Sequence, residues 1–212
     1  MTIDWLKFLG ALVLLLTPTA AFQRKKIRFR SIASDWDQHW GQISSHGLHA
    51  IDLSRAALGA WLLADALANV PGTRGILSHG ILLTQAATMS LAVVLQTIVC
   101  RHPDSFNAPF AFVAGLVLGH TPLLVAGFAL VLTVAITAGT RVPAVYFPLL
   151  AMALPGMGYL FTGKSILLVL LTVGSVALLP WLLALLFSRD LVVAYRARRP
   201  RGLRDDGPAP LR

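Results

Sequence analysis

The stretch from Ser105 to Ser188 constrains the fold more than any other part of the sequence. These 84 residues contain only two charged side chains, Arg141 and Lys164, and no acidic residue. A surface in contact with water carries charge at frequent intervals, so a chain this poor in charge must be surrounded mainly by hydrocarbon. The sequence therefore predicts an integral membrane protein of the all-α class, built as a bundle of about five transmembrane helices, with six possible, and an amphipathic helix at the membrane surface.

The composition agrees with one membrane domain. The chain has 212 residues, 56% of them hydrophobic, and a formal net charge of +9. Its basic residues gather in two clusters beside apolar segments, where membrane orientation and anionic lipid headgroups explain them better than nucleic acid does. A single cysteine excludes an intrachain disulfide and a Cys-rich metal site. We expect no cofactor, no nucleotide and no nucleic acid.

The apolar segments predict a definite order of spans. The expected spans are residues 5–22, 76–100, 108–138, 142–161 and 165–187. The third of these is too long for one straight crossing and too short for two, and we expect a kink or break at Gly119–Pro122. The expected domains are a first helix at 1–22 with the N-terminus outside, a cytoplasmic segment at 23–75, the bundle at 76–188 and a basic, disordered cytoplasmic tail at 189–212.

Residues 1–22 leave two interpretations open. Thr19–Ala21 offers a weak cleavage site for a signal peptide. However, Asp4 offsets the charge of Lys7, and five basic residues follow the apolar run directly. Such a cluster holds that end of the helix in the cytoplasm, so we favour a retained span.

The segment 47–70 is the hardest to assign. Its apolar residues recur at helical spacing, but Asp52, Arg55 and Asp65 interrupt them. An Asp at the centre of a span costs about 2.5–3.5 kcal/mol, so we predict an amphipathic helix on the cytoplasmic surface rather than a sixth span. Five crossings place both basic clusters and the C-terminus in the cytoplasm, as expected for a multi-pass protein of a bacterial-type inner membrane.

Polar residues between positions 35 and 55 are the main candidates for chemistry. Histidine and aspartate side chains are acceptable zinc or iron ligands, and a spacing of three residues makes successive pairs helix neighbours. A solvated helix face with an Asp52–Arg55 ion pair explains the same residues. The metal candidates are Asp35, Asp37, His39, His46, His49 and Asp52, and the catalytic candidates are His46, His49, Asp52 and Arg55.

The predicted spans contain few polar groups. Gln85, Gln96 and His120 should face the bundle, because amides and imidazoles in hydrocarbon need partners. The small residues Ala111, Gly115 and Gly119 form a strip that predicts close helix packing.

Residues Gly158–Ser165 satisfy the pattern GxxxxGK[ST] letter for letter. A phosphate-binding loop needs a preceding strand and a large parallel sheet, whereas these residues lie between two apolar spans. We interpret the match as chance and expect a helical hairpin.

Three function classes remain open. The favoured one is a non-enzymatic membrane subunit or assembly helper, with a membrane protein partner or as a homo-oligomer. The alternatives are a membrane-embedded enzyme acting on lipid or isoprenoid substrates at residues 35–55, and a small carrier using Gln85, Gln96 and His120.

Overall fold

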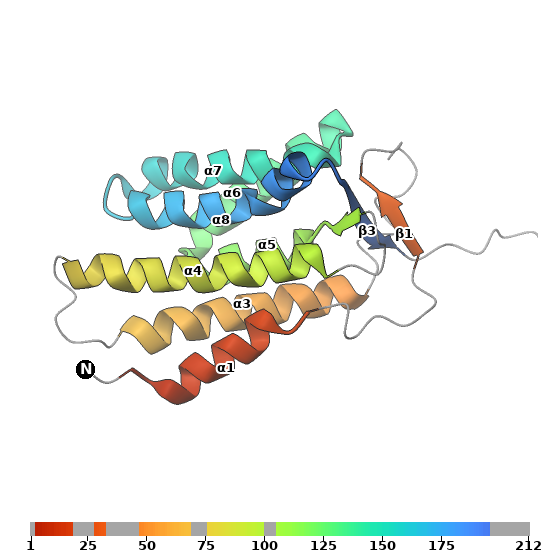
Figure 1. Cartoon of the computed structure of the whole chain (residues 1–212). Helices are drawn as coiled ribbons and strands as arrows, with labels where there is room; N and C mark the ends of the chain where they lie inside the picture. Colours follow the sequence, from red (N-terminus) through yellow and green to blue (C-terminus); the bar gives the residue numbers. More distant parts are fainter. Residues whose placement is uncertain (1–2, 19–27, 33–46, 69–75, 100–104, 196–212) are drawn as a thin grey trace, which may run out of the picture.

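The structure, a computed structural model, describes residues 3–18, 28–32, 47–68, 76–99 and 105–195 (Figure 1). In these residues the chain forms seven α-helices and three short strands. The helices are α1 (Trp5–Leu16), α3 (Gly47–Ala68), α4 (Ile76–Ile98), α5 (Phe110–His120), α6 (Leu123–Thr140), α7 (Tyr146–Thr162) and α8 (Leu167–Leu186). The strands are β1 (Arg28–Ser31), β2 (Ser105–Asn107) and β3 (Asp190–Tyr195), and a short 3₁₀ turn, η2 (Pro143–Val145), precedes α7.

The all-α class expected from the sequence is confirmed. Within the described part of the chain, four segments are long and apolar enough to cross a membrane: His79–Ile98, Leu123–Thr140, Pro143–Thr162 and Leu167–Leu186. Helices α1 and α5 are apolar but shorter. The strands were not expected from the sequence.

The long apolar segment at 108–138 is divided into two helices. Thr121 and Pro122 are both extended, with φ, ψ of −118°, 158° and −54°, 131°. Proline has no N–H to continue the helical hydrogen bonds and disfavours helical geometry in the residue before it. The break therefore lies within the Gly119–Pro122 segment where the sequence placed it.

Helix α3 lies inside the bundle and not apart from it. It packs along α1 on one side and α5 on the other, and Ala56, Ala60 and Leu63 are fully buried. This placement differs from the surface helix expected for residues 47–70. The physical reason is that two of its charged residues pair with each other and the third pairs with α1, so they do not require water around the helix.

The C-terminal half of the bundle is built from close antiparallel pairs. Helix α7 packs on α8 and on α6 (Figure 1). Gly174 of α8 approaches the backbone of α7 so closely that an added Cβ would lie 2.8 Å from the Ala151 carbonyl oxygen. Helix α4 packs on α8 and thereby joins the two halves.

The three strands form one small sheet at one end of the bundle (Figure 1). Strand β3 is central, because it pairs antiparallel with β1 and parallel with β2. The ladder continues at both edges, where the Ile32 N–H donates to the Leu191 carbonyl at 2.7 Å and the Ala108 N–H to the Val192 carbonyl at 2.8 Å. The sheet thus holds together three segments that are far apart in the sequence. We call this the sheet end of the bundle.

Candidate functional site

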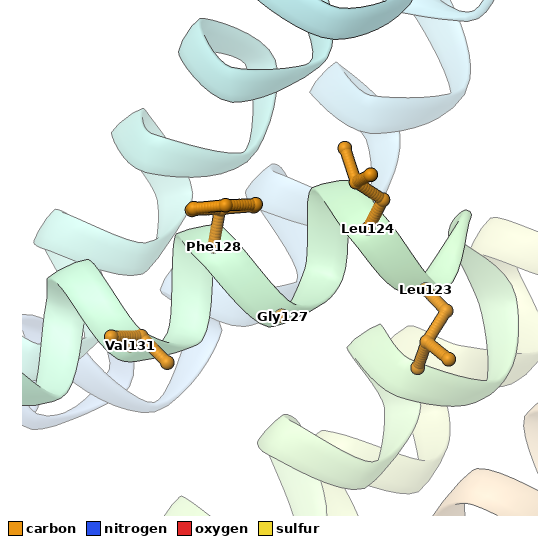
Figure 2. A pocket seen from close by; sticks show the side chains of 5 residues that line it. All are labelled: Leu123, Leu124, Gly127, Phe128 and Val131. Carbon is orange, nitrogen blue, oxygen red and sulfur yellow. The ribbon is translucent and has the colours of Figure 1, made fainter.

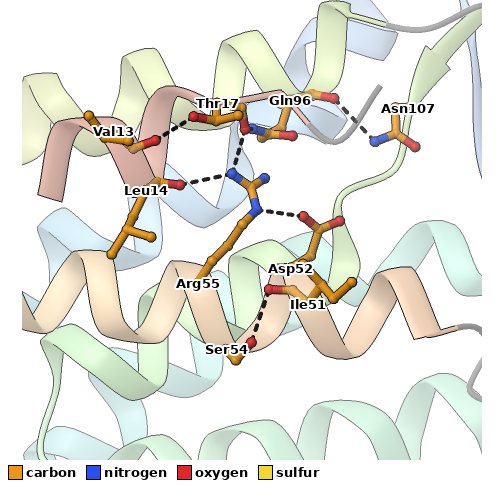
Figure 3. A network of polar contacts seen from close by, with 9 residues as sticks. All are labelled: Val13, Leu14, Thr17, Ile51, Asp52, Ser54, Arg55, Gln96 and Asn107. Carbon is orange, nitrogen blue, oxygen red and sulfur yellow. Dashed lines mark hydrogen bonds and ion pairs between the residues drawn. The ribbon is translucent and has the colours of Figure 1, made fainter. Parts of the chain in front are cut away.

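A buried ion pair on α3 is the centre of the most extensive polar network among the described residues (Figure 3). Asp52 and Arg55 lie one helical turn apart, and the Arg55 Nε donates to the Asp52 Oδ1 at 2.8 Å. Only 7% of Asp52 and 9% of Arg55 is exposed. Charged groups this deeply buried must be paired, and these two are paired with each other.

The network also caps the C-terminal end of α1. The last carbonyls of a helix have no partner within the helix and carry partial negative charge. The Arg55 Nη1 donates to the Leu14 carbonyl at 2.8 Å and to the Thr17 carbonyl. The Gln96 amide of α4 donates to the same Thr17 carbonyl at 2.8 Å. One guanidinium thus holds together α1 and α3, and Gln96 adds α4.

Two further contacts extend the network toward the sheet and α5. The Asn107 amide, at the end of β2, donates to the Gln96 backbone carbonyl at 3.2 Å. The Arg55 guanidinium lies over the ring of Phe112, with its carbon 5.0 Å from the ring centre. Such a cation–π contact adds to the attraction when both groups are desolvated.

The chemistry open to this network is limited. The Asp52 carboxylate accepts from Arg55, and two of the guanidinium nitrogens donate to groups of the chain itself. The Arg55 Nη2 has no hydrogen-bond partner among the described residues. The hydrogen bonds of Arg55 and Gln96 therefore fix α1, α3 and α4 relative to one another.

The proposed metal ligands are only partly covered by the structure. Asp35, Asp37, His39 and His46 lie outside the described residues. His49 and Asp52 both lie on α3, but no group of three or more histidine, cysteine or acidic side chains comes together within the described part of the chain.

A second ion pair joins α1 and α3 near the opposite end of the bundle. The Lys7 Nζ lies 2.6 Å from the Asp65 Oδ2 and 3.3 Å from the Asp4 Oδ2. Asp4 caps α1, because the Lys7 backbone N–H donates to its carboxylate at 3.2 Å. That hydrogen bond is the main reason that the pKa of Asp4 lies below its ordinary value of 3.8.

The three intramembrane polar candidates do not form one site. Gln85 and Gln96 are both at least nine-tenths buried, but eleven residues separate them on α4. At 1.5 Å per residue they lie roughly 16 Å apart along the helix axis. His120 is in the last turn of α5, beside the break, and its Nδ1 is buried without a partner among the described residues.

The strip of small residues on α5 lies against α3. A Cβ on Gly115 or Gly119 would overlap the carbonyl oxygen of Leu53 or Ala57, respectively. Gly115 faces Leu53, and four residues later Gly119 faces Ala57. The residue numbers rise together along both helices, so α5 and α3 run parallel. Ala111, one turn earlier, is half-buried.

An apolar groove of about 580 Å³ runs along α6 (Figure 2). Its floor is Gly127, where an added Cβ would meet nothing within 4 Å. The side chains that line it are Leu123, Leu124, Phe128 and Val131. All four of these side chains are more than half exposed.

The Gly158–Ser165 match to a phosphate-binding loop falls on the α7–α8 hairpin. Gly158 is in the last turns of α7 and faces the Leu170 side chain of α8. The element before the turn is a helix, whereas a phosphate-binding loop follows a strand. Lys164 is exposed in the turn.

The sequence suggested the ion pair between Asp52 and Arg55, which the structure contains, but not the partners that Arg55 and Asp65 have on α1. The acceptors of Arg55 are backbone carbonyls of α1, and the partner of Asp65 is Lys7, which lies 58 residues away. Pro18, directly after the helix, was the only local signal that carbonyls at the end of α1 would need side-chain donors.

Comparison with known protein families, with curated proteins and with solved structures gave no match for this chain.

Proposed function

We infer that this chain is a non-enzymatic subunit of a membrane assembly, in which its own bundle provides a fixed scaffold for other membrane-embedded chains. The observation that carries the proposal is the use of the buried polar groups. Arg55, Asp52 and Gln96 all bond to groups of the chain itself and join α1, α3 and α4. An active site would need some of these groups to point at a substrate.

The outer surface of α6 supports the same proposal. The groove around Gly127 contains only apolar side chains, and close packing of helices in a membrane relies on small residues at the interface. A helix of a partner chain with one bulky side chain over Gly127 would fill this space.

The expected location follows from the helices. Four of them have the length and composition of membrane spans, and we place the protein in a bacterial-type inner membrane as a multi-pass protein with a cytoplasmic C-terminus. The two basic clusters then lie beside anionic lipid headgroups. Each Lys or Arg close to the surface would contribute about 1 kcal/mol to the attraction between the protein and the membrane.

The mass of the purified protein in a mild detergent tests the proposal. We expect the full chain to remain in an assembly larger than one copy. Gly127→Trp should weaken this assembly by filling the groove. Gly156→Trp is the matched control, because Gly156 also faces open space but lies on α7. A wild-type protein that is monomeric and carries no other chain would refute the proposed function.

A further inference from the structure

The small sheet restricts how the chain crosses a membrane. Its strands come from three places in the sequence: after α1, between α4 and α5, and after α8. Hydrogen-bonded strands cannot lie on opposite sides of a hydrocarbon layer about 30 Å thick, and an open sheet edge is not tolerated within it. The segments containing β1, β2 and β3 therefore lie on one side of the bilayer.

The first consequence concerns α3. Between β1 and β2 the chain contains two helices, α3 and α4. Because β1 and β2 lie on the same side of the bilayer, either both helices cross the bilayer or neither does. The α4 segment is long and apolar enough to cross, so α3 crosses as well.

The charges of α3 are placed in a way that permits this crossing. Nine uncharged residues, 56–64, form the middle of the helix. Asp52 and Arg55 lie toward its first end and pair with each other, and Asp65 lies in its last turn and pairs with Lys7. Ionisable residues in a span normally face the bundle and are paired in this way.

The second consequence concerns α5 and α6. Between β2 and β3 the chain contains α5, α6, α7 and α8. The ring of Phe110, at the start of α5, packs on those of Tyr146 and Phe147, at the start of α7, with ring centres 5.0 Å apart in both pairs. Helix α7 therefore begins at the sheet end, where α5 also begins.

Helix α6 returns to that same end. It leads through η2 directly into α7, and Phe128 in its second turn packs on Phe161 in the last turn of α7, with ring centres 5.1 Å apart. The two helices are thus antiparallel, and α6 finishes at the sheet end. Helix α5, with 11 residues, is about 16 Å long at 1.5 Å per residue, which is too short to cross. Helix α6 is long enough to cross, but it starts where α5 ends, so the pair turns back before it reaches the opposite side.

We propose that α5 and α6 form a re-entrant hairpin that enters and leaves the bilayer at the sheet end, with its tip at Thr121–Pro122 inside the membrane, and that α3 is a true transmembrane helix. Irregular backbone at membrane depth is tolerated only where it is packed within protein. Thr121 meets this condition, because it is buried and its hydroxyl donates to the Val117 carbonyl at 2.8 Å. Pro122 is exposed, but it has no N–H to satisfy, and its carbonyl accepts from the Ala126 N–H at 2.9 Å.

The charge distribution identifies the sheet end as cytoplasmic. Of the 18 Lys and Arg residues, 14 lie in sequence segments that either join elements at this end or follow α8 through the strand β3 at this end. These segments are 17–46, 99–109, 141–145 and 187–212. Arg74 and Lys164 lie in the connections at the opposite end, Lys7 lies at the start of α1 and Arg55 lies within α3. Basic residues concentrate on the cytoplasmic side.

This topology differs from the one expected from the sequence at two places. The hairpin topology and the topology expected from the sequence both place residue 140 and the C-terminal tail in the cytoplasm and residue 165 outside. The hairpin topology places Gly72 outside and Cys100 inside, whereas a surface helix at 47–70 followed by three crossings after residue 107 places them the other way round.

Labelling with a membrane-impermeant maleimide decides between them in the full chain. The only cysteine, Cys100, serves as a native probe. We expect it to be labelled only after the cells are opened, and Gly72→Cys in a Cys100→Ser background to be labelled in intact cells. Ser165→Cys and Ser188→Cys are the outside and inside controls. Arg101→Cys replaces the native probe if Cys100 does not react.

The tip of the hairpin needs its own probe. Leu123 is 74% exposed on the protein and lies next to Pro122. Leu123→Cys should resist the reagent in intact cells and in open membranes and react only after denaturation, because lipid covers it. Labelling of Leu123→Cys in intact cells would mean that α5 and α6 each cross the bilayer completely, and would refute the re-entrant hairpin. Labelling of Cys100 in intact cells, or of Gly72→Cys only after opening, would overturn the whole topology.

Discussion

The contact between α5 and α3 offers the sharpest test of the packing. At Gly119 the space for a side chain is closed by backbone, because an added Cβ would overlap the Ala57 carbonyl oxygen and lie 2.9 Å from the carbonyl carbon and 3.0 Å from the Cα. These atoms belong to the middle of a helix and cannot rotate away. Gly119→Ala must therefore push the two helices apart.

The size of the effect follows from the geometry. Relieving the overlap requires a separation of roughly 1 Å, and a gap of about 0.5–1 Å loses a quarter to a half of the dispersion energy of each contact along the interface. Overpacking of a close contact costs about 1–3 kcal/mol. We expect Gly119→Ala to reach this range and Gly119→Leu to exceed it.

Gly127→Ala is the matched control, since the same substitution on α6 meets nothing within 4 Å. It should leave the thermal unfolding temperature in detergent unchanged or slightly higher, because alanine favours helix more than glycine does. Leu118→Ile, beside the contact, should also be mild. Equal unfolding temperatures for Gly119→Ala, Gly127→Ala and the wild type would refute the close contact of α5 with α3.

Three further predictions concern charged groups. Arg55→Met should destabilise the fold by about 3–5 kcal/mol in the detergent unfolding assay, because it leaves the buried Asp52 carboxylate unpaired. The double variant Asp52→Asn, Arg55→Met should recover part of this loss of stability. If it recovers none, the ion pair is not what stabilises this region. The low pKa of Asp4 means that its cap stabilises the fold fully above its ordinary value of 3.8 and that this contribution is lost as the pH falls through the lower folded-state pKa; wild type should therefore lose more stability on acidification than Asp4→Asn, and identical acid profiles would contradict the cap. Neither the wild type nor Lys164→Ala should bind ATP. If the wild type binds ATP and Lys164→Ala does not, Gly158–Ser165 is a true phosphate site.

The sequence by itself determined the class of the protein and most helix positions. A stretch with two charges in 84 residues predicts hydrocarbon surroundings, and this prediction depends on composition alone. The break near Pro122 is equally local, because it follows from the missing N–H and the fixed φ of one residue. The small residues at Gly115 and Gly119 indicated a close contact, but the sequence did not say with which helix.

The tertiary structure decided where the charges of α3 go. Read along the chain, Asp52, Arg55 and Asp65 made a membrane crossing too costly for residues 47–70. The missing information was the set of partners: Lys7 for Asp65 and the carbonyls at the end of α1 for Arg55. Partners 38–58 residues away leave no periodic signal in the sequence, and a backbone carbonyl offers no residue type to recognise.

The sheet was beyond sequence reasoning for a related reason. Each strand has only three to six residues, and their ladder exists because the ends of α1, α4 and α8 meet at one end of the bundle. Strand pairing is a property of two segments at once, whereas hydropathy is summed over one segment at a time. In the topology that we propose, the side of the membrane on which each connection lies therefore follows from hydrogen bonds between distant segments, and not from the count of apolar runs.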